Sequence, residues 1–250
     1  MKSIRLFTLL ATLLFLFQVP YAYASYCSGA AGHKHPNGGG FVAETADVAP
    51  SVFLAEGVQV CDRAKIAGSV YISGFSQVSD NAIISQERID GDIIITGYAE
   101  IGEQAVLRGV PHISGNAVIH NRAQVLDWAE IDGAAIIEND AIIRDWATVS
   151  GKAEIGDHAI LEKWARISGA AEIFDDALIT DSAVVSGDAT IRGKVKLSGQ
   201  AQILGPASLS DNVEIKGTAR VFGAPVICGN LIIAKDITGN EEPKSLCASR

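Results

Sequence analysis

Aromatic residues are scarce in this chain of 250 residues, because phenylalanine, tyrosine and tryptophan together make up only 6%. Methionine occurs once and proline 7 times, whereas glycine occurs 25 times. With 48% of its residues hydrophobic the chain can bury a core, but that core must be built from small aliphatic side chains. This composition favours one elongated domain over a wide globular one.

Apolar runs long enough to span a bilayer are also missing. The longest run, residues 6–17 (LFTLLATLLFLF), is too short for a membrane helix and follows the basic residues Lys2 and Arg5. Ala22-Tyr23-Ala24 then matches an A-x-A cleavage site. We therefore expect a signal peptide over 1–24, cleavage near Ala24, and export to the periplasm or the medium without a membrane span.

Basic residues are too few for a nucleic-acid-binding protein. Loss of Lys2 and Arg5 with the signal peptide leaves 18 of the 20 basic residues against 29 acidic ones, a net charge of −11. A charge of this sign disfavours nucleic acid and anionic membranes as partners.

No C-x-x-C pair occurs among the four cysteines, which argues against a thiol enzyme or a zinc site. An exported chain favours disulfides instead. Cys27 and Cys61 lie towards one end, and Cys228 and Cys247 towards the other. Of the three pairings we favour Cys27 with Cys61 and Cys228 with Cys247, because each pair then ties a terminal segment to the repeat described next.

Aliphatic residues recur every sixth position. From Ile89 to Ile233 all 25 such positions are Ile, Leu or Val, and 18 of the 24 residues two places before them, from 93 to 231, are Ala. An earlier block runs from Val42 to Ile84 with the same spacing, and one missing residue joins the two blocks. A period of six is a β-helix repeat, in which each hexad is a short strand followed by a turn.

Three hexads make one coil, because glycine recurs every 18 residues from Gly97 to Gly223 at one turn position. Residues 18 apart then stack about 4.8 Å apart on neighbouring coils. All three tryptophans of the chain follow this spacing, so Trp128, Trp146 and Trp164 should form one ladder. We predict a triangular prism of about 11 coils over 42–233, an N-terminal cap over 25–41 and a C-terminal tail over 234–250.

The N-A-x-I-x-x pattern of NAVIHNRAQVLDWAEIDGAAIIENDAIIRD resembles the hexapeptide-repeat transferase superfamily, and the resemblance includes its uncharacterised acetyltransferase-like members. The resemblance implies an all-β fold, namely the single-stranded left-handed parallel β-helix. It also implies a homo-oligomer, for which a trimer is the usual arrangement in the family. Family acyltransferases use a histidine base and often carry an inserted loop. From the unbroken period after Ile89 we expect no such loop here.

Histidine offers a weak catalytic candidate. His158 falls at a corner in a column with Asp140 and Asp176, which suits either an acid-supported base or a solvated ladder of alternating charge. We favour the ladder. His112, His120 and His158 do not have the spacing of the zinc histidines in γ-type carbonic anhydrases, and His33 with His35 fits a polar loop. We expect no metal and no cofactor.

Apolar residues at outward positions are the stronger candidate for a site. They lie on the face before the tryptophan corner, interrupted by Gln124: Val106, Leu126, Ile142, Ile160 and Leu178. Beside three tryptophans such a stripe favours an interface or a ligand platform. Two functions stay open: a non-catalytic exported β-helix that self-associates and binds a glycan or a protein, and an acyltransferase-like enzyme with a site between protomers around His158.

Overall fold

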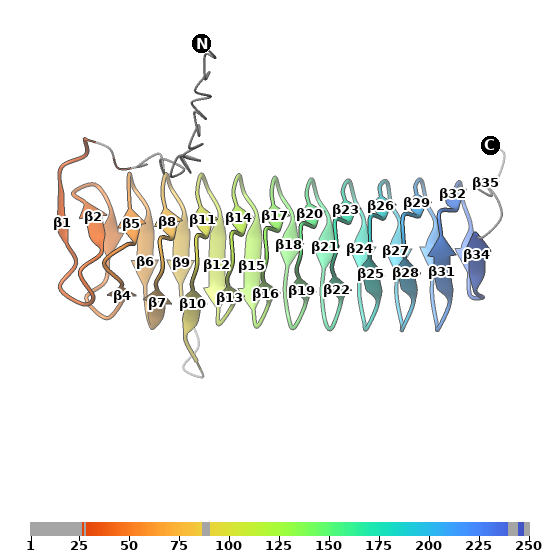
Figure 1. Ribbon diagram of the computed structural model, residues 1–250, viewed down its shortest axis with the longest axis horizontal. Helices are drawn as coiled ribbons and strands as arrows, with labels where there is room; N and C mark the ends of the chain where they lie inside the picture. The colour runs from red at the N-terminus through yellow and green to blue at the C-terminus, as the bar shows by residue number, and fades with distance from the viewer. Residues whose placement is uncertain (1–26, 28, 87–90, 240–244, 248–250) are drawn as a thin grey trace, which may run out of the picture.

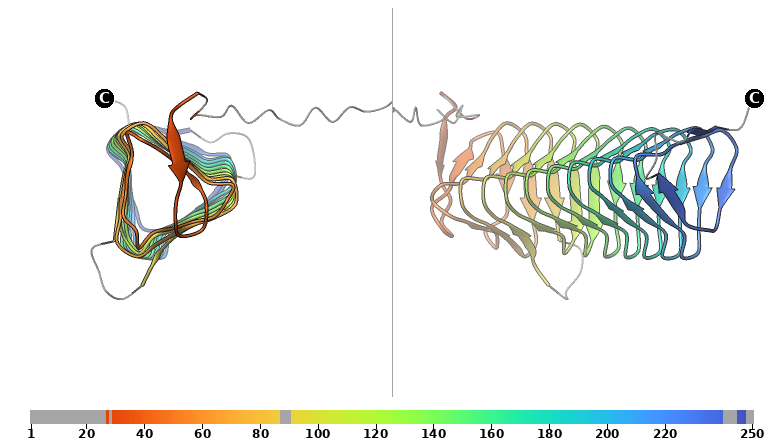
Figure 2. Two further views of the ribbon diagram at one scale, coloured as in Figure 1. Left: turned by 90° about the vertical axis from the view of Figure 1, so that its left-hand side faces the viewer. Right: turned by 45° about the vertical axis from the view of Figure 1, so that its right-hand side comes forward.

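In the computed structural model the chain winds as a β-helix in which each coil contributes one short strand to each of three sheets (Figure 1). The structure describes residues 27, 29–86, 91–239 and 245–247, so the predicted signal peptide lies outside the described residues. Seen along its axis the prism is triangular (Figure 2). The predicted all-β, left-handed parallel β-helix of about 11 coils is confirmed, with 11 strands in each of two sheets.

The first sheet carries the N-terminal cap strand, which is antiparallel, and 12 parallel strands after it. Its strands are β1 (Gly32–Lys34), β2 (Phe41–Ala43), β5 (Gln59–Val60), β8 (Gln77–Val78), β11 (Glu100–Ile101), β14 (Val118–Ile119), β17 (Ile136–Ile137), β20 (Glu154–Ile155), β23 (Glu172–Ile173), β26 (Thr190–Ile191), β29 (Ser208–Leu209), β32 (Val226–Cys228) and β35 (Ser245–Cys247).

The second sheet follows the first along each coil. Its strands are β3 (Asp47–Val48), β6 (Lys65–Ala67), β9 (Ile83–Ser85), β12 (Val106–Gly109), β15 (Gln124–Asp127), β18 (Ile142–Ile143), β21 (Ile160–Leu161), β24 (Leu178–Ile179), β27 (Lys196–Leu197), β30 (Glu214–Ile215) and β33 (Ile232–Ile233).

The third sheet closes the triangle. Its strands are β4 (Phe53–Leu54), β7 (Val70–Ile72), β10 (Ile93–Ile95), β13 (His112–Ile113), β16 (Glu130–Ile131), β19 (Thr148–Val149), β22 (Arg166–Ile167), β25 (Val184–Ser186), β28 (Gln202–Leu204), β31 (Arg220–Gly223) and β34 (Ile237–Gly239). Among the described residues there is no helix with the length and apolar character needed to cross a membrane.

The core is the stack of aliphatic and alanine columns predicted from the hexad. In a representative coil Ile131, Ile137 and Ile143 are completely buried, and so are Ala135 and Ala141. Neighbouring coils pair in parallel, so that Ile137 lies between Ile119 and Ile155. Each alanine fills the tight corner space beside a larger residue, which explains why the column two places before each aliphatic residue is so uniform.

The three corners use different residues for the same left-handed turn. At the corner from the third to the first sheet, here the glycine corner, Gly133 has φ +77° and a β-carbon there would lie 2.5 Å from the Gly151 carbonyl oxygen. At the corner between the first and second sheets aspartate and asparagine predominate, whereas the corner between the second and third sheets has glycine on some coils and aspartate on others. Aspartate side chains at these corners accept backbone N–H bonds from the next coil, as Asp145 does from Lys163 at 2.9 Å. These bonds tie each coil to its successor.

One prediction about the repeat is wrong. The strands β7 and β10 pair Ile72 with Ile95, a step of 23 residues instead of 18, so five extra residues lie between Ile84 and Ile95. Ile89 lies outside the described residues, and Ile95 takes the next inward position. The sequence pattern could not reveal this insertion. In a period of six, adding five residues moves all later aliphatic positions to the same place in the repeat as removing one residue does.

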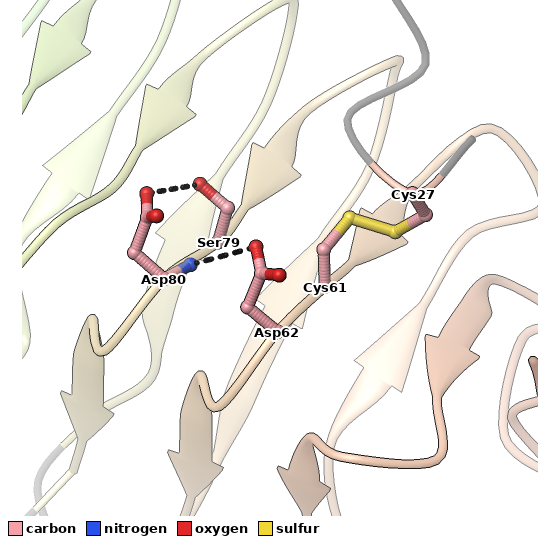
Figure 3. The surroundings of a disulfide bond; sticks show 5 residues. All are labelled: Cys27, Cys61, Asp62, Ser79 and Asp80. Carbon is pink, nitrogen blue, oxygen red and sulfur yellow. Dashed lines mark hydrogen bonds between the residues drawn. A yellow bond between two sulfur atoms is a disulfide. The ribbon is translucent and has the colours of Figure 1, made fainter. Parts of the chain in front are cut away.

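Each end of the prism carries a disulfide. At the N-terminus β1 pairs antiparallel with β2, and the Cys27–Cys61 disulfide joins this cap to the coil that carries β5 (Figure 3). At the C-terminus Cys228 is bonded to Cys247. The pairing is the one favoured from the sequence. The tail differs from a simple cap, since β34 and β35 continue the parallel pairing on β31 and β32 and place Leu246 against the core.

Candidate functional site

The three tryptophans lie on the corner between the second and third sheets, here the tryptophan corner. Their rings are stacked nearly parallel, with centroids 5.1 Å apart for Trp128 and Trp146 and 4.7 Å apart for Trp146 and Trp164. Trp146 and Trp164 are 43% and 54% exposed. Because stacking covers the ring faces inside the ladder, it presents mainly indole edges to the solvent.

A groove of about 340 Å³ runs beside this ladder, and its other wall is polar. That wall consists of Glu130, Thr148 and Arg166, the outward residues of β16, β19 and β22 in the third sheet. These residues stack in register on successive coils. The groove, here the Trp groove, therefore has an aromatic side and a side with one acid, one hydroxyl and one guanidinium.

The predicted apolar stripe lies on the other side of the same corner. Val106, Ile142, Ile160 and Leu178 point outward from β12, β18, β21 and β24 of the second sheet and are half-buried, as is Leu126 on β15. The tryptophans and these residues border one corner, but the Trp groove opens towards the third sheet. The stripe and the groove are consequently two surfaces, each with its own chemistry.

Polar contacts hold the tryptophan corner rigid. Arg144 Nε donates to Glu162 Oε2 at 3.1 Å, and Thr180 Oγ1 donates to Glu162 Oε1 at 2.9 Å, so three coils are joined. Burial acts to raise the pKa of Glu162, but the hydrogen bonds from Arg144 and Thr180 outweigh it and lower that pKa. Its carboxylate is thus charged at neutral pH. A rigid ladder loses little conformational freedom when a ligand binds.

His158 is an open corner residue. Its ring nitrogens lie 3.9 Å from Asp140 and 3.8 Å from Asp176, beyond hydrogen-bond distance, and its side chain is 70% exposed. These three residues lie in one exposed polar column along the corner between the first and second sheets. Within the part of the chain that the structure describes, no three His, Cys, Asp or Glu side chains form a group able to hold a metal ion.

His120 is better supported by acids than His158, which the sequence did not indicate. Its Nε2 lies 3.3 Å from Glu138 and its Nδ1 3.9 Å from Glu103, and the side chain is 31% exposed. The signal was available in principle, because Glu103 and Glu138 lie about one coil before and after His120 in the repeat. His112 is exposed on β13, His33 is exposed on β1, and His35 is buried in the N-terminal cap.

Comparisons with known proteins found one solved structure with a low structural similarity to this chain. No family model matches the chain, and no curated protein matches it either. The match to a solved structure of LpxA from Acinetobacter baumannii covers 80% of this chain and 71% of the LpxA chain, with 15% sequence identity and a TM-score of 0.24. The protein is a hexapeptide-repeat β-helix. That conclusion rests on the period of six and the sheet register, and the LpxA likeness adds no argument about activity.

Three acidic residues lie close together on the first sheet and give a pH-dependent prediction. Glu154 pairs directly with Glu172 in the parallel ladder. The pKa of Glu154 is raised mainly by burial of its carboxyl group, and further by the negative charges of Glu138 and Glu172. A raised carboxyl pKa lowers stability as the pH rises through it. We expect Glu154→Gln to raise the Tm at pH 7 by about 1–3 °C. In thermal unfolding scans the gain should vanish near pH 4, and an equal gain at both pH values would contradict the charge explanation.

Proposed function

We propose that this protein is an exported, non-catalytic binding module that holds a glycan in the Trp groove. The observation that carries the proposal is the pairing of an indole wall with Glu130, Thr148 and Arg166 in one groove of about 340 Å³. A sugar has apolar C–H surfaces and hydroxyl groups that both donate and accept hydrogen bonds. The groove offers an apolar wall of indole edges to the C–H surfaces and a polar wall to the hydroxyl groups.

The polar wall favours a neutral glycan over a charged ligand. Glu130 accepts hydrogen bonds, Arg166 donates them, and the Thr148 hydroxyl does both. The acid and the guanidinium oppose each other in sign, so neither an anion nor a cation gains a net attraction. The ladder covers two steps between coils, roughly 10 Å, which suits a ligand of about two sugar rings.

The exposed setting of His158 supports the non-catalytic part of the proposal over the acyltransferase alternative. Asp140 and Asp176 stand too far away to fix its ring by a hydrogen bond, and the side chain is 70% exposed. A general base needs an orienting partner and protection from water.

The aliphatic stripe supports a homo-oligomer, which we propose forms between copies of this chain through the second sheet. Six successive coils contribute β9, β12, β15, β18, β21 and β24 to this sheet, and five of their outward residues are aliphatic, with Gln124 of β15 as the exception: Ile83, Val106, Ile142, Ile160 and Leu178. A band of this length is typical of an interface. A trimer is the arrangement that the family resemblance implies.

Replacing Trp128, Trp146 and Trp164 together by Ser should weaken glycan binding at least tenfold, because aromatic anchors carry most of the energy of such contacts. The inward columns are untouched, so the variant should keep its β-sheet circular dichroism. Binding is measured by NMR titration with cellotriose, chitotriose and maltotriose. In the wild type, intrinsic fluorescence reports the same event, since every tryptophan of the chain lines the groove.

A matched control is a stacked aromatic pair on the third sheet away from the groove, Phe53 and Tyr71, whose centroids lie 4.7 Å apart. Replacing both by Ser should leave glycan binding unchanged. The solution mass of the tryptophan variant should equal that of the wild type if the oligomer forms through the stripe. Failure of the wild type to bind any of the three sugars, or equal binding by the tryptophan variant, would defeat the proposal.

A further inference from the structure

A second cavity, of about 300 Å³, lies on the outer surface of the first sheet, on a different side of the prism from the Trp groove. It spans three coils, those of β8, β11 and β14. Its central residue is Gly102, which has no side chain where the neighbouring coils carry Ser79 and His120. A β-carbon at Gly102 would lie 3.1 Å from Asp80 Oδ2 and 3.2 Å from Ser79 Oγ. The cavity thus exists because one side chain in the column is missing.

A buried acceptor without a partner lines this cavity. Gln77 is only 6% exposed, and its Oε1 has no hydrogen-bond partner among the described residues. An unpaired buried polar atom costs about 1–3 kcal/mol. An unpaired acceptor on a residue that lines a cavity points to a ligand that supplies a donor.

Acidic groups dominate the rest of the wall. Asp80, Glu100 and Glu103 all line the cavity. Asp80 Oδ2 accepts bonds from Ser79 Oγ at 2.9 Å and from the backbone N–H of Glu103 at 3.0 Å, which hold that carboxylate in place. The His120 Nε2 faces Glu138, at 3.3 Å. The cavity is therefore rich in acceptors and negative charge, and Val118 adds an apolar wall.

We propose that this cavity binds a small organic cation with a primary ammonium group. An ammonium carries three donors and no acceptor, which complements Gln77 Oε1 and the surrounding carboxylates. Its alkyl part would lie along Val118. This site is independent of the proposed glycan site, because the two share no residue and lie on different sheets.

Putrescine is the probe, titrated into the full chain by isothermal calorimetry at low ionic strength. We expect saturable binding that weakens as salt is added. Its fully methylated analogue, 1,4-bis(trimethylammonio)butane, keeps both positive charges but has no N–H donor, so it should bind at least tenfold more weakly because it leaves Gln77 Oε1 unpaired. Equal binding of the two compounds would overturn the assignment, and so would the absence of putrescine binding.

Two variants locate the site. Gly102→Val fills the cavity with a side chain whose nearest neighbours are the movable ends of Asp80 and Ser79, and it should reduce putrescine binding at least tenfold. Ser210→Val is the matched control, because Ser210 holds the same strand-end position six coils further along the first sheet. It should bind putrescine as the wild type does.

Gln77→Leu separates binding from folding. It removes the unpaired oxygen while keeping a side chain of similar size, so thermal stability without ligand should stay the same or rise, while putrescine affinity should fall about tenfold. Binding unchanged in both Gly102→Val and Gln77→Leu would place the amine elsewhere and overturn the proposal. Calcium chloride that displaces putrescine at equal ionic strength would show an inorganic cation site instead.

Discussion

Gly133→Ala should destabilise the β-helix by about 3 kcal/mol or more, although it adds a single methyl group at the surface. The residue has φ +77°, a conformation that costs an L-residue about 1–2 kcal/mol. The new β-carbon would also lie 2.5 Å from the carbonyl oxygen and 2.7 Å from the nitrogen of Gly151 on the next coil. The Gly151 carbonyl oxygen accepts an inter-coil hydrogen bond from the Ala134 backbone N–H at 2.6 Å, so the turn cannot shift away without disturbing that bond. Urea unfolding followed by circular dichroism measures the loss.

Gly217→Ala is the control for this prediction. Its φ of +71° is nearly the same, but a β-carbon there meets nothing within 4 Å. The variant should therefore lose only the conformational part, about 1–2 kcal/mol. Equal losses in the two variants would show that backbone conformation alone, and not the close approach of coils, requires glycine at the glycine corner.

Removing either disulfide should cost about 3 kcal/mol, concentrated at the end of the prism that it clamps. Cys27 and Cys61 close a loop with a sequence separation of 34, and Cys228 and Cys247 one of 19, so each bond restricts the unfolded chain to a similar degree. In a solenoid each coil contacts only its neighbours, so an end can open before the middle does.

Hydrogen exchange tests where the loss occurs. In Cys228→Ser/Cys247→Ser the amides of β32 and β31 should exchange faster, while those of the central strand β17 keep their protection. The reverse pattern is expected in Cys27→Ser/Cys61→Ser, with faster exchange in β2 and β5. Uniform acceleration along the whole chain in either variant would mean that the coils unfold as one unit and that the bonds are not local clamps.

Much of the fold could be predicted from the sequence because every coil needs the same inward-pointing residues and the same turns. An aliphatic residue every sixth position and Ala two places before it specify which side chains point inward, and both columns are buried as expected. Glycine every 18 residues identified the coil length, since the corner requires it on each pass. The tryptophan ladder followed from the same interval, because residues one coil apart stack directly above one another.

Three features were decided only by the tertiary structure. Five extra residues before Ile95 are invisible to a period of six, and only the pairing of β7 with β10 distinguishes them from one missing residue. The side to which the Trp groove opens depends on the outward residues of the third sheet, which are remote from the aliphatic stripe. The cavity at Gly102 is formed by side chains from three successive coils around a position that has no side chain. That Gln77 Oε1 has no hydrogen-bond partner there also follows only from the arrangement of these coils. Repetition determines what points inward, whereas the surface is set by non-repeated side chains whose contacts are formed between coils.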